Sequence, residues 1–328
     1  MEHTIDRNLS LEMARVTEAA ALSAARWMGR GDKEAADQAA VDAMRLLLGT
    51  IEMHGVVVIG EGEKDHAPML YTGEEVGCAD QPHVDIAVDP IDGTRLLAFG
   101  MPNSIAVVAI AERGAMFASP KIMYMEKLAV GADAAGVIDI TDGVAANLRR
   151  IADAKRRDIP DLTVVILDRP RHEQLIAEVR DAGARIKLIT DGDVAGALMA
   201  AIPSTGLDVL MGIGGAPEAV IAACALKCAG GDMQCRLWPR NDEERKFAKD
   251  DKIDLQRVLR LDDLVAGDNV LFAATGITDG ELLHGVQFFG DGARTQSLVM
   301  RAKSGTVRFI ESTHKLSKLQ SYGAIPFD

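Results

Sequence analysis

The sequence Val84-Asp85-Ile86-Ala87-Val88-Asp89-Pro90-Ile91-Asp92-Gly93-Thr94 contains an apolar run, a turn and two acidic side chains within eleven positions. Residues 84–88 form a short β-branched run, which predicts a strand that delivers Asp89 to its end. Pro90 fixes φ and forces the chain to turn, so we expect the carboxylates of Asp89 and Asp92 to converge on one spot. Two such carboxylates are tolerated side by side when a cation lies between them, and hard oxygen ligands suit Mg²⁺ or Mn²⁺. The alternative is an ordinary turn in which Asp and Gly serve only the backbone.

The end of the same stretch is similar to the motif of one known class of phosphatases but differs from it at one position. Gly93 allows the backbone to approach a ligand closely, and Thr94 adds a hydroxyl. Haloacid-dehalogenase-type enzymes use Asp-x-Asp-Gly-Thr, in which the first Asp is the nucleophile. Counting back from Asp92, Pro90 occupies that position. No aspartyl phosphate can form there, so that class is excluded for this site.

Two further acidic sites follow predicted strands. Glu61 and Glu63 lie in a glycine-rich loop directly after the strand expected at 56–59. Glu218 follows residues 214–217, Gly-Gly-Ala-Pro, and is placed in the first turn of an expected helix, where an anion is favoured. Its apolar neighbours leave two interpretations open, a carboxylate that serves the helix dipole and a metal ligand.

Three other groups are less specific when taken alone. Asp37 lies on an expected helix and reads as an ordinary surface acid. Arg169-Pro170-Arg171 follows a strand and could clamp a phosphate, because arginine offers a planar fork, or it could be a solvated turn. Asp191-Gly192-Asp193 could hold sugar hydroxyls or cap the next helix.

The order of apolar residues predicts an α/β protein in two consecutive domains. The first part carries two helices, at 9–28 and 33–54, followed by strands. The second alternates strand and helix, which is typical of a sheet covered by helices with sites at the carboxyl ends of the strands. We expect the domains to be 1–160, which contains Asp37, Glu61, Asp89 and Asp92, and 161–328, which contains Glu218, Arg169 to Arg171 and Asp191 to Asp193. The expected strands are 56–59, 84–88, 105–111, 123–130, 136–140, 163–167, 185–189 and 207–211, and the later helices are 171–182, 193–201 and 217–229, with 241–252 a solvated helix or loop.

The charge balance of the chain excludes some partners. Its 328 residues include 36 basic and 49 acidic side chains, for a formal net charge of −13. Nucleic-acid binding needs a basic face, so this balance argues against it. Residues 1–10 lack the apolar segment of a secretion signal, and the apolar stretch 209–226 is interrupted by glycines and by Glu218. We therefore expect a cytoplasmic protein that does not enter a membrane, with four unpaired cysteines.

Several of these motifs together resemble class II fructose-1,6-bisphosphatases over about residues 9–314. The resemblance places the chain in the wider lithium-sensitive phosphatase superfamily, which includes inositol monophosphatases, and implies a layered α/β/α/β/α sandwich. The motifs are Gly29-Arg30-Gly31-Asp32-Lys33, Val58-Ile59-Gly60-Glu61-Gly62-Glu63, Ala67-Pro68-Met69-Leu70-Tyr71, Asp85-Ile86-Ala87-Val88-Asp89-Pro90, Met123-Tyr124-Met125-Glu126-Lys127-Leu128 and Gly212-Ile213-Gly214-Gly215-Ala216-Pro217-Glu218.

The resemblance also implies a site, position by position. Where this chain has Asp92 the family usually has Glu, so Asp92 could reach a metal directly or through a water. The implied metal ligands are Asp37, Glu61, Asp89, Asp92 and Glu218, for two or more Mn²⁺ or Mg²⁺ ions. The implied substrate contacts are Asp92, Gly93, Thr94, Tyr124, Arg169, Pro170, Arg171, Asp191, Gly192, Asp193 and Gly215.

The activity that the resemblance implies is hydrolysis of the 1-phosphate of fructose 1,6-bisphosphate, in gluconeogenesis or the Calvin cycle. A metal-activated water would attack, with Asp37, Thr94 and Glu61 as catalytic residues and Arg169 or Arg171 on the second phosphate. A homodimer or homotetramer is also implied. The alternative activities are hydrolysis of sedoheptulose 1,7-bisphosphate or of an inositol phosphate. An alternative from a different functional class is a sugar-phosphate sensor without catalytic activity.

Overall fold

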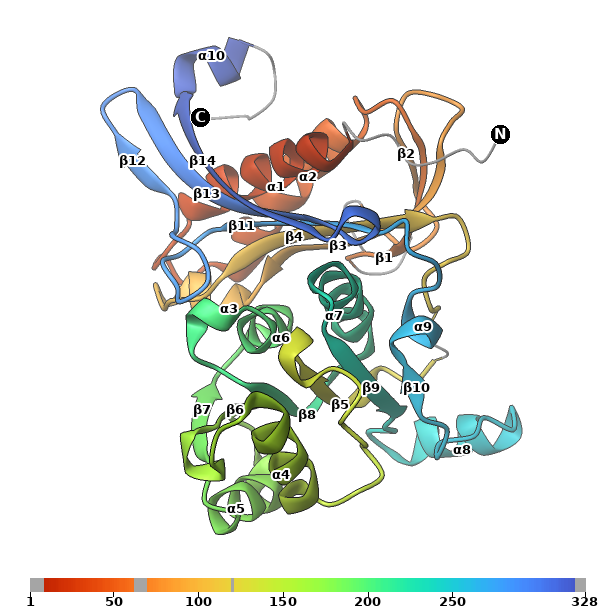
Figure 1. Cartoon of the computed structure of the whole chain (residues 1–328). Coiled ribbons are helices and arrows are strands. Elements are labelled where there is room, and N and C mark those ends of the chain that lie inside the picture. The colour runs from red at the N-terminus through yellow and green to blue at the C-terminus, as the bar shows by residue number, and fades with distance from the viewer. Residues whose placement is uncertain (1–8, 62–69, 119–120, 322–328) are drawn as a thin grey trace. The chain divides into compact units, whose positions relative to one another are not determined.

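The computed structural model describes residues 9–61, 70–118 and 121–321 and divides the chain into two compact units (Figure 1). The first unit contains residues 1–116 and 267–328, and the second contains residues 117–266. Each unit is built around its own β-sheet. The chain therefore leaves the first sheet, completes the second, and returns to finish the first.

The first unit has an eight-stranded sheet, counted over the described residues, in the order β12-β13-β11-β4-β3-β1-β2, with β14 paired to β13. Strands β1 and β3 run parallel, whereas β4, β11, β13 and β14 continue the sheet with antiparallel pairs. The strands are β1 (His54–Ile59), β2 (Glu75–Val76), β3 (His83–Asp92), β4 (Ile105–Glu112), β11 (Leu271–Gly276), β12 (Gln287–Phe289), β13 (Gly292–Arg301) and β14 (Thr306–Lys315), and the helices are α1 (Leu9–Ala25), α2 (Lys33–Leu48), α3 (Thr94–Ala98) and α10 (Leu316–Ser321).

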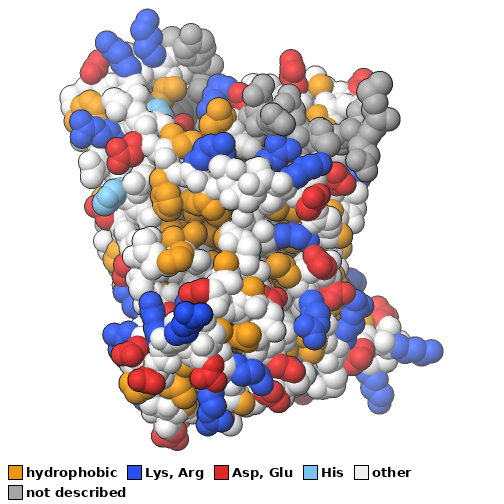
Figure 2. Space-filling view, viewed as in Figure 1, with side chains coloured by type: hydrophobic (Ala, Val, Ile, Leu, Met, Phe, Trp, Pro, Cys, Tyr) orange, Lys and Arg blue, Asp and Glu red, His pale blue; other side chains and the backbone are white. Residues whose placement is uncertain are grey.

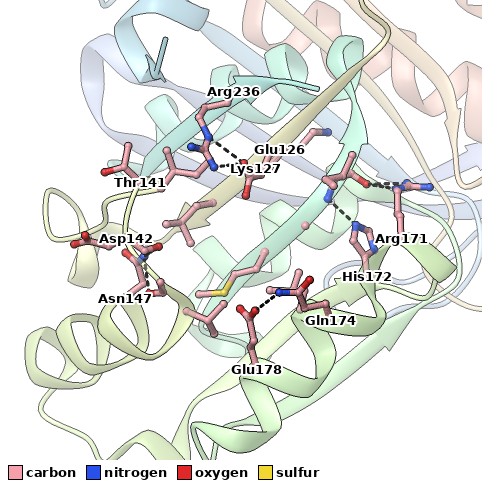
Figure 3. Close-up of a pocket in the computed structure, with 18 residues that line it drawn as sticks. Glu126, Lys127, Thr141, Asp142, Asn147, Arg171, His172, Gln174, Glu178 and Arg236 are labelled. Atoms are coloured by element: carbon pink, nitrogen blue, oxygen red, sulfur yellow. Dashed lines mark hydrogen bonds and ion pairs between the residues drawn. The ribbon is translucent and has the colours of Figure 1, made fainter. Parts of the chain in front are cut away.

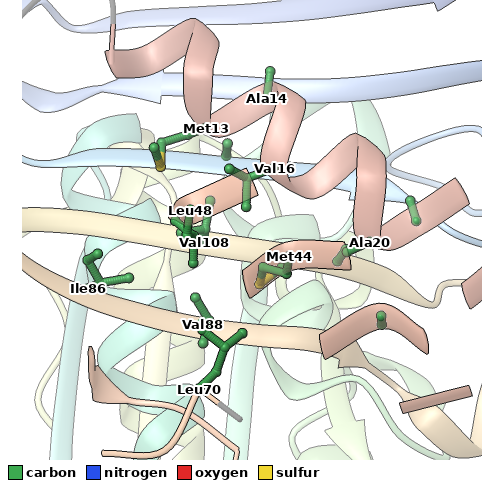
Figure 4. Close-up of a cluster of buried hydrophobic side chains, with 14 of the residues drawn as sticks. Met13, Ala14, Val16, Ala20, Met44, Leu48, Leu70, Ile86, Val88 and Val108 are labelled. Atoms are coloured by element: carbon green, nitrogen blue, oxygen red, sulfur yellow. The ribbon is translucent and has the colours of Figure 1, made fainter. Parts of the chain in front are cut away.

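The core of the first unit lies between this sheet and the helix pair α1 and α2 (Figure 4). Met13 and Val16 of α1 and Met44 of α2 are buried in the same cluster as Ile86 and Val108 from the central strands. Alternate residues of a strand face opposite sides, so this cluster occupies one face of the sheet only. Aliphatic side chains supply nearly all of this packing, as the low aromatic content requires.

The second unit has a six-stranded sheet in the order β10-β9-β5-β8-β6-β7. Strands β6, β7 and β8 run parallel, and β5 is antiparallel to β8 and β9. The strands are β5 (Tyr124–Val130), β6 (Thr163–Leu167), β7 (Arg185–Ile189), β8 (Val209–Gly215), β9 (Asp232–Leu237) and β10 (Leu259–Arg260), and the helices are α4 (Val144–Lys155), α5 (Glu173–Asp181), α6 (Asp193–Ala201), α7 (Ala216–Ala229), α8 (Asp242–Asp250) and α9 (Leu261–Leu264).

Helices cover both faces of this second sheet. Ile151 of α4 and Val179 of α5 share a buried cluster with Val164 of β6. The next residue, Val165, points to the opposite face, and there Gly196 of α6 lies against it. The expected α/β class is therefore confirmed: both units are sheets covered by helices.

Two sequence expectations about local structure are wrong. The second helix ends at Leu48 rather than near His54, because residues 54–59 pair with β3 as strand β1. Residues 136–140 form no strand, because Gln234 takes their hydrogen bonds: its side chain accepts from Ile140 N at 2.9 Å and donates to Ile138 O at 2.8 Å. In both places a partner distant in sequence decides the conformation.

The two units also differ from the expected domains 1–160 and 161–328. Strand β5 precedes residue 160 but pairs with β8 and β9, so it belongs to the second sheet. Strand β11 follows residue 161 but pairs with β4 of the first sheet. The expected boundary falls inside the second unit, between α4 and β6.

No helix in the described part of the chain is both long enough and apolar enough to cross a membrane. On the face shown in Figure 2, acidic and basic side chains are interspersed, and no large area of that face is uniformly basic among the side chains described.

A buried chain of hydroxyls joins α1 to the first sheet and gives a test of its packing. Thr275 Oγ1 lies 2.7 Å from both Thr17 Oγ1 and Ser297 Oγ, and all three side chains are buried. Thr275→Val should lower the free energy of unfolding by about 1–3 kcal/mol, because two buried hydroxyls lose a partner. Denaturant unfolding measures this, with Thr275→Ser as the control that keeps the hydroxyl. A valine variant as stable as the wild type would contradict this account of the network.

Candidate active site

Asp89 and Asp92 are brought to one face of the first sheet by an irregularity in β3. Asp89 pairs with Val107 and Asp92 pairs with Ile105, so three steps along β3 match two steps along β4. In a regular strand, residues three apart face opposite sides, whereas this bulge restores both carboxylates to the same side. Asp89 Oδ1 also accepts a hydrogen bond from Ile91 N at 3.1 Å, which fixes the local backbone. The bulge, and not a turn, therefore places Asp89 and Asp92 on one face: the expected turn at Pro90 is wrong, because β3 continues through Pro90 to Asp92.

Gly93 and Thr94 connect this strand to Asp37. Gly93 has φ = +93°, a left-handed conformation that favours glycine, and α3 begins immediately after it at Thr94. Thr94 Oγ1 lies 3.2 Å from Asp37 Oδ1 and 3.2 Å from Ile91 O, so its hydroxyl can donate to either. Asp37 comes from α2, far away in sequence. The structure therefore brings together two residues that the sequence could join only through the family resemblance.

Glu61 lies at the edge where β1 and β3 end. These two strands are parallel, so their carboxyl ends share that edge. Gly60 is required there because a Cβ would lie 1.9 Å from Leu70 O. Glu61 N donates to the same carbonyl at 3.0 Å, which holds the backbone of the loop. Glu63 lies outside the described residues.

The donor chemistry of this edge fits a hard divalent cation. Asp37, Glu61, Asp89 and Asp92 offer carboxylate oxygens, which are the ligands that Mg²⁺ and Mn²⁺ prefer. Across the described residues, however, no three His, Cys, Asp or Glu side chains are placed closely enough to form a metal cluster as they stand. Each of the four carboxylates has interactions within the protein.

In the second unit, the predicted sugar-phosphate residues share one edge of the sheet. Arg169 follows β6, Asp191 follows β7 and Gly215 ends β8, and these three strands are parallel. Tyr124 begins the antiparallel strand β5 and pairs directly with Gly215. These predicted residues therefore lie together at one end of the sheet, and Arg169, Asp191 and Gly215 are at the carboxyl ends of its parallel strands, where α/β sheets commonly bind ligands.

Arginine and tyrosine side chains meet at this edge. The guanidinium carbon of Arg171 lies 5.1 Å from the centre of the Tyr124 ring, and its Nη2 donates to Ile213 O at 2.7 Å. Arg169 Nη2 lies 3.8 Å from Asp191 Oδ1, across the ends of β6 and β7. Burial lowers the pKa of Arg171. The predicted substrate residues from three separate loops are therefore neighbours in space.

Lys127 contacts the predicted site residue Asp193, although its sequence position did not indicate a role. It lies in the middle of β5, its side chain is buried, and its Nζ forms an ion pair with Asp193 Oδ2. Gly214 leaves room for this pair, because a Cβ there would lie 2.0 Å from Asp193 Oδ2. The available signal was a lysine followed by the apolar residues Leu128 to Val130 of the same strand, since a charge is buried only when it is paired.

Glu218 carries the clearest sign of a missing partner in the second unit. It lies in the first turn of α7, and its Oε2 is inaccessible to solvent with no hydrogen-bond partner among the residues that the structure describes. Burial raises the pKa of this carboxyl, and the nearby Lys127 opposes that rise. A Cβ on Gly215 would lie 1.8 Å from Oε2, so the glycine makes the space in which the carboxylate sits. An orphaned buried carboxylate oxygen is the kind of group that a divalent cation satisfies.

His172 was not identified from the sequence either, and it connects the strands whose ends carry the predicted substrate residues. Its Nε2 accepts from Ile213 N at 2.7 Å, so its Nδ1 carries the proton and donates to Leu167 O at 2.6 Å. A neutral imidazole is the form that makes both bonds. It thereby ties β8 to the end of β6, directly beside Arg171.

A cavity of about 400 Å³ opens on the α4 and α5 side of the second sheet (Figure 3). Its walls carry the ion pair of Arg236 with Glu126, whose closest atoms are 2.6 Å apart, together with Arg171 and His172. Of the predicted site residues, Arg171 alone lines this cavity within the described chain. The cavity is therefore separate from the strand-end edge, although the two share Arg171.

The burial of His172 makes stability depend on pH. Desolvation lowers its pKa below the ordinary 6.5, and Arg171 and Arg169 act in the same direction, while the Leu167 carbonyl and Asp193 oppose it. Between the lowered folded pKa and 6.5 the unfolded chain binds more protons, so the free energy of unfolding should fall as the pH drops through this window. Denaturant unfolding at pH about 7.5 and about 5.5 measures the fall. His172→Gln should reduce it, and equal pH dependence in both proteins would contradict this account.

One unit carries carboxylates at the ends of its strands, and the other carries arginine, tyrosine and acidic side chains at its strand ends. These groups suit an enzyme that handles a phosphorylated sugar. Residues 7–314 match the family described as bacterial fructose-1,6-bisphosphatase, glpX-encoded. The chain belongs to this family, and it is a phosphatase of the fructose-1,6-bisphosphatase type.

Curated relatives agree over nearly the full length. The chain is 48% identical to a protein from Haemophilus influenzae named fructose-1,6-bisphosphatase class 2, with 96% of this chain and 98% of the relative aligned. It is also 48% identical to a protein from Synechococcus sp. (strain JA-2-3B'a(2-13)) named D-fructose 1,6-bisphosphatase class 2/sedoheptulose 1,7-bisphosphatase, with 97% of this chain and 99% of the relative aligned.

Proposed function

We propose that this protein hydrolyses the 1-phosphate of fructose 1,6-bisphosphate to give fructose 6-phosphate and inorganic phosphate, by direct attack of water. Family membership supports the substrate. The observation that carries the mechanism is the hydrogen bond between Thr94 and Asp37 beside the bulge that carries Asp89 and Asp92.

We propose Asp37, Glu61, Asp89, Asp92 and Glu218 as the ligands of two or more Mn²⁺ or Mg²⁺ ions. Such ions lower the pKa of a bound water and neutralise charge on phosphoryl oxygens. The remaining steps belong to the chain's own residues.

Asp37 and Thr94 would orient the attacking water. Because Asp37 accepts the Thr94 hydroxyl hydrogen, the lone pairs of Thr94 Oγ1 are left to accept a hydrogen from water. One carboxylate at this edge, Asp37 or Glu61, would take up the proton that the water loses and supply it, directly or through solvent, to the departing sugar oxygen. The water oxygen then bonds to phosphorus, the bond from phosphorus to the sugar oxygen breaks, and that oxygen gains a proton. No covalent enzyme intermediate forms.

The second unit would hold the sugar. Tyr124, Arg169 and Arg171 suit the phosphate that does not react, because guanidinium and phenol groups donate to phosphate oxygens. The other proposed contacts are Gly93, Pro170, Asp191, Gly192, Asp193 and Gly215, with Asp191 and Asp193 accepting from sugar hydroxyls.

A second activity, hydrolysis of sedoheptulose 1,7-bisphosphate, is favoured by the name of the Synechococcus relative. The two ketose bisphosphates share the phosphate-bearing end that reacts. We further propose a homodimer or homotetramer in the cytoplasm, acting in gluconeogenesis or the Calvin cycle, by analogy with the family.

The test is phosphate release from fructose 1,6-bisphosphate, sedoheptulose 1,7-bisphosphate and inositol 1-phosphate, with Mn²⁺, with Mg²⁺ and with a chelator. We expect release from fructose 1,6-bisphosphate that requires a divalent ion. Binding without turnover would support the sugar-phosphate sensor instead. Phosphate covalently attached to the protein after rapid acid quenching would refute direct attack by water.

A further inference from the structure

The ring of Tyr124 has two guanidinium groups against it. The guanidinium carbon of Arg171 lies 5.1 Å from the ring centre, and that of Arg240 lies 5.5 Å from it. The Trp238 ring also lies against Tyr124 in an edge-to-face arrangement. The two ring centres are 6.3 Å apart, and the ring planes meet at 82°. Trp238 N also donates to Tyr124 O at 2.9 Å, so the end of β9 is fixed to the start of β5. All four side chains belong to the second unit.

Each guanidinium group is held through its Nε and Nη2 atoms. Arg171 donates from Nε and Nη2 to Ile213 O, at 3.1 and 2.7 Å. Arg240 donates from Nε to Glu244 Oε1 at 2.7 Å, and its Nη2 lies 2.6 Å from the same oxygen. In both arginines these bonds leave Nη1 without a hydrogen bond to the described part of the chain, so two planar donors are positioned in advance.

The anchor of Arg240 is itself rigid. The buried carboxylate of Glu244 also accepts from Arg240 N at 2.9 Å, so it holds the backbone and the side chain of the same arginine. Glu244 N in turn donates to Asn241 Oδ1 at 2.9 Å, at the start of α8. The arginine is therefore constrained even though its side chain is 45% exposed.

The charges around the ring favour an anion. Arg171 is fixed to a carbonyl rather than to a carboxylate, so its charge is not neutralised by its closest partner. Arg240 is paired with Glu244, so the uncompensated charge beside the ring is that of Arg171. A phosphate ester carries two negative charges and several acceptor oxygens, and guanidinium groups match it in shape as well as in charge.

We propose that Arg240 binds, together with Arg171 and Tyr124, the phosphate of the substrate that does not react, and that it makes the enzyme specific for sugar bisphosphates over sugar monophosphates. This inference rests on the proposed function and adds a residue that neither the sequence motifs nor the resemblance indicated. The signal in the sequence was weak, because Arg240 lies beside a charged run that predicts only a solvated surface.

The test compares Arg240→Gln and Arg240→Lys with the wild type in the metal-loaded enzyme. For fructose 1,6-bisphosphate we expect Arg240→Gln to raise KM roughly 10- to 100-fold, the range for hydrogen bonds to a charged group, with kcat little changed. Arg240→Lys should lie in between, since it keeps the charge and loses the fork. Fructose 1-phosphate lacks the distal phosphate, so its kinetics should be unchanged.

A binding measurement complements the kinetics. Fructose 6-phosphate retains the distal phosphate, and Trp238 beside Tyr124 should report its binding by a change in fluorescence, read in a Trp27→Phe background because the chain has two tryptophans. Arg240→Gln should weaken this binding by the same factor as KM. The control is Arg245→Gln, an exposed arginine of α8 paired with Asp242 at 3.3 Å, which should match the wild type in both assays.

The outcomes separate the two proposals. A wild-type enzyme that does not hydrolyse fructose 1,6-bisphosphate would refute the proposed function. An active wild type whose KM and fructose 6-phosphate affinity are unchanged in both Arg240 variants would overturn this inference alone. Equal losses for fructose 1,6-bisphosphate and fructose 1-phosphate would also overturn it, because they would indicate general damage to the fold. If Arg240→Gln does not fold, Arg240→Lys, which can keep the pairing with Glu244, decides by the same criteria.

Discussion

Asp89→Asn should reduce kcat by roughly a thousandfold or more while the protein stays folded, because the metals proposed here contribute several kcal/mol of transition-state stabilisation. Asparagine has the shape of aspartate, and its amide oxygen can still accept from Ile91 N, so the local backbone is retained. It lacks the charge that attracts a divalent ion. The loss should therefore appear in Mn²⁺ binding by calorimetry as well as in activity.

The matched control for Asp89→Asn is Asp85→Asn. Asp85 lies on the same strand and the same face, but it pairs with Arg113 at 3.4 Å and accepts from Met116 N at 3.2 Å. Its substitution should lower the free energy of unfolding and leave Mn²⁺ affinity unchanged. Full activity and normal Mn²⁺ binding in Asp89→Asn would remove Asp89 from the site.

Lys127→Met should have the second large effect, a loss of about 3–5 kcal/mol in the free energy of unfolding. Methionine fills a similar volume, but it leaves the carboxylate of Asp193, whose side chain is only 11% exposed, without its partner. Glu218 also loses the positive charge that opposes the rise in its pKa. Removing one member of a buried pair costs far more than removing both, because an uncompensated charge remains.

A double-mutant cycle tests this account of Lys127. Asp193→Asn combined with Lys127→Met should recover part of the stability that Lys127→Met loses, because the unpaired charge is gone. Denaturant unfolding of the four proteins gives the coupling. Strictly additive losses, or a loss below about 1 kcal/mol in Lys127→Met, would show that the ion pair does not hold this edge together.

Local patterns predicted the parts of the site that are continuous in sequence. Strand 84–88 follows from residues within one stretch, and the structure confirms it and places Asp89 and Asp92 on one face. The turn expected at Pro90 is wrong, because the strand continues through Pro90 to Asp92. The bulge that places Asp89 and Asp92 on one face could not be predicted from the sequence, because it depends on the register between β3 and β4. The neighbouring positions of Asp37 and Thr94 are likewise set by how α2 packs on the sheet.

The later strands were missed for a different reason. In β14 the residues that face away from the helices include Val307 and Phe309, both substantially exposed, so apolar and polar positions do not alternate cleanly. The glycines at the end of β8 resembled a loop, yet they continue the strand to Gly215 because the space of their missing side chains is filled by Asp193 and Glu218. Glycine in a strand here marks the close approach of a functional group.

The return of the chain to its first sheet has a consequence for synthesis on the ribosome. Strand β4 cannot gain its partner β11 until the whole of residues 117–266 has been made, so the first sheet must wait with one long edge unpaired. The inserted unit has no such delay. Its own sheet is complete within the insertion, and Phe117 N donates to Leu264 O at 2.9 Å, which joins its two ends. The middle of this polypeptide can therefore complete its sheet before its beginning does.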